Sequence, residues 1–195
     1  MKVYFTASLR GKKRYGKNYE AIVRTLKEFE CDVISDHVLK ESYEKVETLS
    51  DDYRVDYYKR MLTWISSSDV VVAEVTESST SIGHEVTLCL EKGKPVIGLC
   101  EEGNVPTIFK ALKEDKFMII TYSNLENDLR LKLRKALKRA QKSIDIRFNF
   151  FISPQISQYL DWVAKKKRLP RSVYLRKLIE EDMSKQTDYS EQKKE

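Results

Sequence analysis

Short apolar runs alternate with helical patterns through the first two thirds of the chain. The apolar runs predict strands at residues 2–7, 32–35, 70–75, 95–100 and 117–122. Between them, apolar residues at helical spacing predict helices at residues 18–30, 52–68, 84–93 and 105–115. Strands that alternate with helices form right-handed crossovers and a parallel sheet. We therefore predict an α/β fold with a parallel sheet of about five strands.

Glu85 follows the predicted strand at 70–75 across a polar turn. Open α/β sheets bind ligands at the carboxyl ends of their strands, which makes this carboxylate a candidate site residue. The next helix is predicted to start at His84, so Glu85 falls in its first turn and faces the surface. The alternative is that Glu85 only complements the helix dipole. Residues 37–52 have no clear pattern, and loops of this length often lie over active sites.

Charge is unevenly distributed along the chain. Residues 1–123 carry 18 Lys and Arg against 20 Asp and Glu, whereas residues 124–195 carry 18 against 10. The start of this basic part, residues 123–144, predicts a connecting helix. No run approaches the length of a membrane span and the first residues enter a strand directly, so we expect a cytoplasmic protein. Three cysteines lack paired spacing and are interpreted as packing residues, and we expect neither a metal site nor a cofactor. They are Cys31, Cys89 and Cys100.

The pattern changes after residue 144 to one strand and two helices. Residues 145–152 alternate, and residues 154–168 and 170–185 have helical spacing with a proline at each start. About 40 residues cannot bury a sufficient core alone, so we expect this part to pair with a second copy. Residues 186–195 lack apolar side chains and predict a disordered tail.

The strand–helix–helix order of residues 145–184 resembles a ribbon-helix-helix domain. The resemblance implies that two chains pair their strands into a ribbon, which in the DNA-binding members enters the major groove of double-stranded DNA. The outward side chains that would read bases are Arg147, Asn149 and Phe151. Two alternatives stay open: a helical hairpin used for packing, and a ribbon that only dimerises an enzyme.

Four motifs within residues 1–122 resemble the nucleoside 2-deoxyribosyltransferase superfamily. In chain order they are "VYFTASLRG", "SDHV", "LTWISSSDVVVAEVT" and "SSTSIGHE". They are most similar to the branch of 2'-deoxynucleoside 5'-phosphate N-hydrolases. The resemblance implies a flavodoxin-like doubly wound sheet, usually dimeric, that cleaves the N-glycosidic bond of deoxynucleosides or their monophosphates.

The same resemblance implies roles for individual residues. It makes Glu85 the nucleophile and places Tyr4 beside it. A carboxylate beneath the anomeric carbon stabilises an oxocarbenium-like state, and a helix N-terminus would keep Glu85 ionised. The substrate-binding residues that the resemblance implies are Ser8, Leu9, Arg10, Gly11, Ser79 and Gly83.

Three positions depart from the family's pattern. Met61 stands where the family has an aspartate that helps to protonate the departing base. Ser81 replaces a glycine, and Asp115 matches a phosphate-binding serine that the neighbouring subunit contributes.

These observations leave three hypotheses for the function. The first is an N-glycosidase or deoxyribosyltransferase that acts on a nucleoside or nucleotide as a homodimer or higher homo-oligomer. The second is a DNA-binding regulator whose α/β domain binds a nucleoside or nucleotide without turnover. The third is a module that only pairs subunits. The predicted domains are the α/β domain at 1–122, the basic helix at 123–144 and the ribbon-helix-helix domain at 145–185, before the tail.

Overall fold

The computed structural model describes residues 1–48, 50–144 and 150–186. The chain divides into two compact units, Met1–Ile146 and Arg147–Glu195. Each unit has its own buried apolar cluster. Within the described ranges, no helix is long and apolar enough to cross a membrane.

A parallel sheet forms the centre of the first unit. Its five described strands are β1 (Lys2–Ala7), β2 (Asp32–Ile34), β3 (Val70–Glu74), β4 (Val96–Glu101) and β5 (Phe117–Tyr122). They lie in the order β2-β1-β3-β4-β5, and every neighbouring pair is parallel. The predicted α/β fold with about five parallel strands is therefore confirmed. This is the order of flavodoxin-like sheets, whose switch point lies between β1 and β3.

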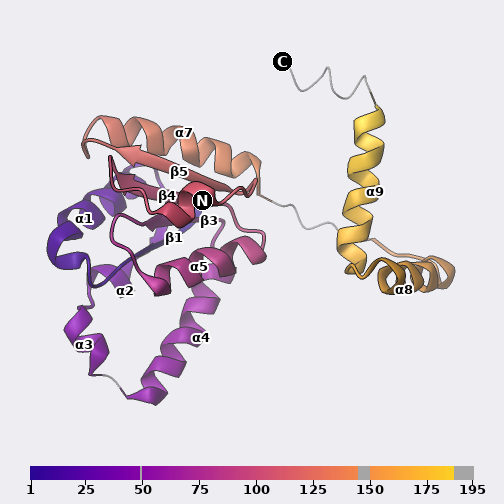
Figure 1. Cartoon of the computed structure of the whole chain (residues 1–195), viewed down its shortest axis with the longest axis horizontal. Coiled ribbons are helices and arrows are strands. Elements are labelled where there is room, and N and C mark those ends of the chain that lie inside the picture. Colours follow the sequence, from indigo (N-terminus) through magenta and orange to yellow (C-terminus); the bar gives the residue numbers. More distant parts are fainter. Residues whose placement is uncertain (49, 145–149, 187–195) are drawn as a thin grey trace. The chain divides into compact units, whose positions relative to one another are not determined.

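Helices cover both faces of this sheet (Figure 1). On one face lie α1 (Lys12–Glu28) and α7 (Asp128–Lys142). On the other face lie α4 (Asp51–Ser67) and α5 (Thr80–Glu91). The short helices of this unit are α2 (Asp36–Leu39), α3 (Tyr43–Glu47) and α6 (Thr107–Ala111).

The side chains of β3 explain why both faces must be covered. Val70 and Val72 join the buried cluster under α1 and α7, whereas Val71 and Ala73 join the cluster under α4 and α5. Successive strand residues point to opposite faces, so a continuous apolar run is stable only between two layers of helices. The predicted packing role of the three cysteines agrees, since all three are free and buried.

Helix α7 is part of the first unit. Its apolar stripe, including Leu129, Leu133 and Leu137, is buried in the cluster on the α1 face of the sheet. The sequence predicted a connecting helix over residues 123–144, which differs from this arrangement. The prediction of a connecting helix relied on the many basic side chains of this segment. Its apolar residues nevertheless have the 3.6-residue period of a helix that packs on the core.

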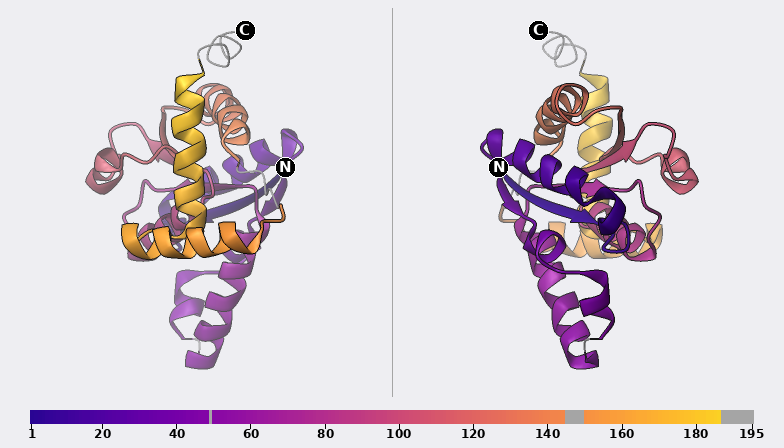
Figure 2. Two further views of the ribbon diagram at one scale, coloured as in Figure 1. Left: turned by 90° about the vertical axis from the view of Figure 1, so that its right-hand side faces the viewer. Right: turned by 90° about the vertical axis from the view of Figure 1, so that its left-hand side faces the viewer.

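The second unit contains α8 (Pro154–Lys167) and α9 (Arg171–Lys185), which cross each other (Figure 2). A small buried cluster of Leu160, Val163 and Tyr174 joins them. Both helices were predicted. Of the predicted strand, residues 145–149 lie outside the described residues, and residues 150–152 belong to no helix or strand. Of the predicted tail, residues 187–195 also lie outside them.

Candidate functional site

A cavity of about 330 Å³ lies at the carboxyl edge of the sheet, beside the switch point between β1 and β3. Its walls come from the loop after β1, the α2–α3 segment, α4, and the β3–α5 connection with the start of α5 (Figure 1). His37, Val38, Tyr43 and Val46 all line it. The segment without a clear sequence pattern thus lies over the cavity, as predicted.

Glu85 lines this cavity from the second turn of α5. The helix begins at Thr80 and is capped by Ser79, whose Oγ accepts a hydrogen bond from the Ile82 N–H at 3.4 Å. The predicted placement in a first turn is therefore wrong, because polar residues interpreted as a turn open the helix instead. The predicted surface orientation is also wrong, since Glu85 is only 6% exposed.

Two hydroxyl groups hold the Glu85 carboxylate. The Tyr4 hydroxyl donates a hydrogen bond to Glu85 Oε2 at 2.9 Å, and Thr6 provides another. Burial raises the pKa of Glu85, and these two hydrogen bonds act in the opposite direction. The Tyr4 and Thr6 hydroxyls thus favour the ionised form, a role that the sequence assigned to the helix N-terminus.

The Tyr4 ring, whose hydroxyl contacts Glu85, is the first of three stacked aromatic rings. The Tyr4 and His37 rings are stacked at 5.0 Å between centroids, and the His37 and Trp64 rings at 4.8 Å. Among the described residues, neither His37 ring nitrogen has a hydrogen-bond partner. Burial lowers the pKa of His37 to about 4, so its imidazole is neutral at pH 7. His37 is therefore a buried neutral imidazole whose ring nitrogens have no protein partner within the described residues.

The loop after β1 forms the opposite side of the cavity. Ser8, Leu9 and Arg10 line it together with Ser79. The Arg10 guanidinium donates from Nη2 to the Tyr43 hydroxyl at 2.6 Å and lies 4.8 Å from the centroid of that ring. Four of the predicted substrate-binding residues are thereby brought to the same cavity as Glu85.

Gly11 shapes this loop without lining the cavity. A Cβ atom at this position would lie 2.7 Å from both the Glu77 Cβ and the Tyr19 hydroxyl, so no larger side chain fits without a shift. Its N–H donates to Ser8 Oγ at 3.4 Å, which closes the loop. Gly83 lines a neighbouring cavity of about 280 Å³ instead of the one that contains Glu85. Both glycines were predicted to contact substrate.

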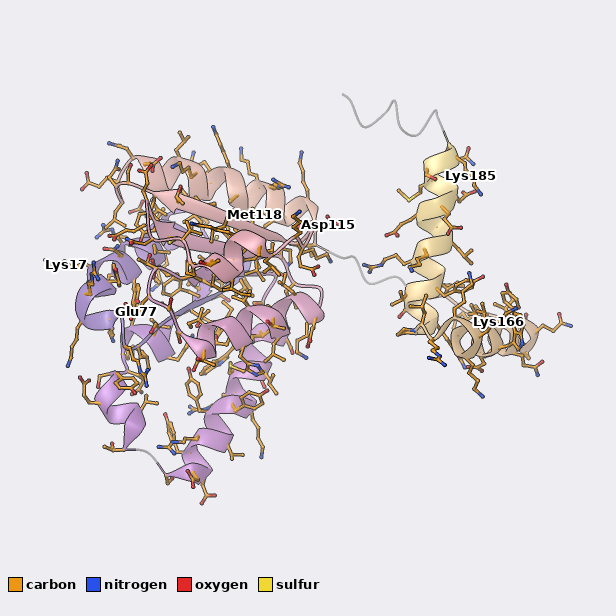
Figure 3. The ribbon with its side chains drawn as sticks, viewed as in Figure 1. Lys17, Glu77, Asp115, Met118, Lys166 and Lys185 are labelled. Atoms are coloured by element: carbon orange, nitrogen blue, oxygen red, sulfur yellow. The ribbon has the colours of Figure 1, made fainter. Side chains whose placement is uncertain are left out.

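Two of the departures noted in the sequence lie away from the cavity. Met61 is 3% exposed and packs in the core between the sheet and α4. Asp115 precedes β5 and lies at the amino edge of the sheet, whereas Glu77 follows β3 at the carboxyl edge (Figure 3). Ser81, by contrast, lines the cavity.

Several residues of the cavity wall were not identified from the sequence, among them Thr6, His37 and Tyr57. Thr6 follows Tyr4 by two positions on β1 and thus faces the same side, a signal that strand alternation contained. His37 lies within the motif "SDHV" but was assigned no role. Tyr57 lines the cavity from α4, one turn before Met61.

A second buried carboxylate, Glu74, is the last residue of β3. Glu74 is 0% exposed, and its Oε1 accepts hydrogen bonds from the Tyr122 hydroxyl at 3.1 Å and from the Thr76 hydroxyl. Its Oε2 has no hydrogen-bond partner among the described residues. Burial raises the pKa of Glu74 to about 7. Since it links β3 to β5 beneath the α1 face, its role here is structural.

The three residues predicted to contact DNA belong to the second unit. Arg147 and Asn149 are outside the described residues. Phe151 is fully exposed, at 106%. Base reading by these three side chains stays a prediction.

No family model matches the chain. A Nematostella vectensis protein whose name describes a 2'-deoxynucleoside 5'-phosphate N-hydrolase is 36% identical over 100 residues, which cover 50% of this chain and 66% of that protein. The 5-hydroxymethyl-dUMP N-hydrolase of Danio rerio is 32% identical over 101 residues, which cover 51% of this chain and 68% of the relative.

A solved structure shows the same fold. The CMP N-glycosidase BcmB of Clostridium botulinum aligns with a TM-score of 0.50 at 20% sequence identity. The alignment covers 68% of this chain and 98% of that one. At this level of identity the likeness supports the α/β architecture alone.

Proposed function

The chain belongs to the 2'-deoxynucleoside 5'-phosphate N-hydrolase family, and from that membership we propose that it is an N-glycosidase acting on 2'-deoxynucleosides or their 5'-monophosphates. The observation that carries the proposal is a buried Glu85 carboxylate that lines a cavity and accepts a hydrogen bond from Tyr4. In this proposal Glu85 is the nucleophile.

The chemistry suits a carboxylate in that place. Departure of the base leaves positive charge on the sugar, and a carboxylate beneath the anomeric carbon stabilises this oxocarbenium-like state and can bond to it. The Tyr4 and Thr6 hydroxyls hold Glu85 in one orientation and favour its ionised form. Because Glu85 is buried, little water competes with this electrostatic stabilisation.

The side of the cavity formed by the β1 loop is suited to a 5'-phosphate. Arg10 supplies a guanidinium, Ser8 and Ser79 supply hydroxyl groups, and the N-terminus of α5 adds backbone N–H donors. A phosphate held there leaves the base to the side of His37 and Tyr57. The phosphate requirement is tested by comparing KM for a deoxynucleoside and its monophosphate.

The function is tested by incubating the full-length protein with a panel of deoxynucleosides, their 5'-monophosphates and the matching ribonucleotides. Chromatography measures the free base, and an added second base reveals transfer in place of hydrolysis. We expect base release from at least one 2'-deoxynucleotide. Absence of release from every member of the panel would reject an N-glycosidase of this class.

We propose a second function for residues 145–185, which is to pair two subunits as a ribbon-helix-helix domain and to bind double-stranded DNA. The supporting observation is that large apolar side chains of this unit are exposed in the single chain, and a second copy would cover them. They are Phe150, Phe151, Ile152, Ile156, Tyr159, Trp162, Val173, Leu178 and Ile179. Sedimentation tests the pairing: we expect a dimer for the wild type and a monomer for Trp162→Glu.

DNA binding requires cations as well as a ribbon. Residues 165–168 form an exposed basic run at the end of α8, and phosphate contacts of this kind give a steep salt dependence. Gel-shift titration compares the wild type with an Arg147→Ala, Asn149→Ala double variant. A preferred sequence that only the wild type selects supports base reading, whereas no binding at physiological salt rejects it.

A further inference from the structure

Helix α4 carries two candidate positions for a group that assists the departing base. Tyr57 and Met61 are four residues apart on α4, which places them about 40° apart around the helix axis and about 6 Å apart along it. Met61 is sealed in the core, whereas Tyr57 lines the cavity that contains Glu85. The structure thus places a tyrosine in the cavity wall one turn before the position at which the family resemblance implies an acid.

The surroundings hold the Tyr57 ring in place. It packs edge-on against Trp64, with 5.9 Å between centroids and an interplanar angle of 82°, and lies 6.5 Å from the His37 ring. Within the described part of the chain its hydroxyl makes no hydrogen bond, which leaves the O–H free to meet a ligand. By contrast the hydroxyl of its neighbour Tyr58 pairs with His84 Nε2 at 3.2 Å and lies outside the cavity.

We propose that Tyr57 is a catalytic residue whose hydroxyl donates a hydrogen bond to the departing base, an inference that rests on the N-glycosidase function proposed above. From α4 it would assist the departure of the base, which the buried, apolar Met61 side chain cannot do. The base it serves carries a carbonyl oxygen or ring nitrogen as acceptor on the His37 side of the cavity.

Tyr57 keeps its proton throughout the reaction. A Glu85 oxygen bonds to C1' as the C1'–N bond breaks, and the electron pair of that bond leaves with the base. The Tyr57 O–H stabilises the resulting negative charge. Water then protonates the base, and its hydroxide attacks C1', which releases the sugar and restores the Glu85 carboxylate.

The ionisation of Tyr57 agrees with a donor that keeps its proton. Burial and the nearby charge of Glu85 both raise the pKa of Tyr57. A phenol with a raised pKa is a poor acid for complete transfer but remains a hydrogen-bond donor throughout the working pH range.

The test compares Tyr57→Phe with the matched control Tyr58→Phe on two substrates. One is a natural 2'-deoxynucleoside 5'-monophosphate, and the other is 4-nitrophenyl 2-deoxyribofuranoside 5-phosphate, whose leaving group departs as a stable anion. Phenylalanine preserves the ring contacts with Trp64 and His37. Thermal unfolding confirms that both variants fold.

We expect Tyr57→Phe to lower kcat on the natural substrate about 10- to 100-fold and on the nitrophenyl substrate less than about threefold. Tyr58→Phe should match the wild type on both. An unchanged rate for Tyr57→Phe on the natural substrate, or an equal loss on both substrates, overturns the inference. If the wild type itself releases no base, the proposed function fails first, and that result is distinct from a failure of Tyr57 alone.

Discussion

The Tyr4 hydroxyl and Glu85 Oε2 lie 2.9 Å apart although 81 residues separate them in the sequence. Tyr4 is in the middle of β1, paired with Val71 of β3, and Glu85 is in the helix that follows β3. The adjacency of β1 and β3 at the switch point therefore creates the contact. The strand order thus brings a tyrosine of one strand to a carboxylate in the helix that follows the neighbouring strand.

Replacing Tyr4 with Phe tests this contact. A hydrogen bond to a charged group contributes about 1.5 to 3 kcal/mol, so we expect kcat/KM for base release to fall about 10- to 100-fold. Because the Tyr4 hydrogen bond lowers the pKa of Glu85, the acid limb of the pH–rate profile should also move to higher pH. Tyr122→Phe is the matched control, since its hydroxyl meets the other buried carboxylate, Glu74. Equal effects of the two variants would contradict a specific role for Tyr4.

His37 predicts a loss of stability in acid. Its folded pKa of about 4 is below the ordinary value near 6.5, so its contribution to the free energy of unfolding is complete above pH 6.5 and is lost as the pH falls towards 4. The size is on the order of 3 kcal/mol. Urea unfolding from pH 4 to 7 should show that His37→Phe lacks this loss. Compared with the wild type, His37→Phe should therefore gain stability as the pH falls from 6.5 to 4.5, and a variant whose pH profile runs parallel to that of the wild type would show that His37 is not buried as a neutral ring.

The buried Glu74 predicts that the free energy of unfolding changes in the opposite direction over nearly the same pH range. Its folded pKa of about 7 is above the ordinary value of 4.5, so its contribution is complete below pH 4.5 and is lost as the pH rises through 7. The loss is again on the order of 3 kcal/mol. Glu74→Gln keeps the shape of the side chain and removes this contribution, so its free energy of unfolding should rise relative to that of the wild type between pH 4.5 and 7. Glu91→Gln, at an exposed position of α5, is the control and should follow the wild type.

The two groups oppose each other, so the wild type should be nearly flat from pH 4.5 to 6.5 while each single variant slopes. A double variant, His37→Phe with Glu74→Gln, should be flat again. A steep slope in the double variant would mean that other groups determine the pH dependence.

Much of the sheet was predictable because its strands are short apolar runs between helical patterns. The β5 bounds, residues 117–122, agree with the prediction, and β3 differs from it by one residue. The start of α5 was not predictable in the same way. Ser79, Thr80 and Ser81 are typical of a turn, and only the side-chain bond from Ser79 to the Ile82 N–H shows that they open a helix.

The candidate site was predictable where a family motif named a residue, as for Glu85, Tyr4 and Arg10. The site was not predictable where the cavity wall depends on tertiary packing. Tyr57 lines the cavity because Met61 and Ile65 anchor α4 in the core and set the rotation of the helix. The predicted dimer ribbon falls largely outside the described residues, and a single chain gives it no partner strand.

The central claim is that Glu85 is the nucleophile of an N-glycosidase, and single-turnover base release by the wild type and Glu85→Gln tests it most directly. The substrate is the 2'-deoxynucleoside 5'-monophosphate that the wild type cleaves fastest. Glutamine fills the same buried space and removes the charge, so Glu85→Gln should remain folded, as circular dichroism would show. We predict a rate at least about 1,000-fold below that of the wild type. A folded Glu85→Gln protein that releases base within about tenfold of the wild-type rate would contradict the account.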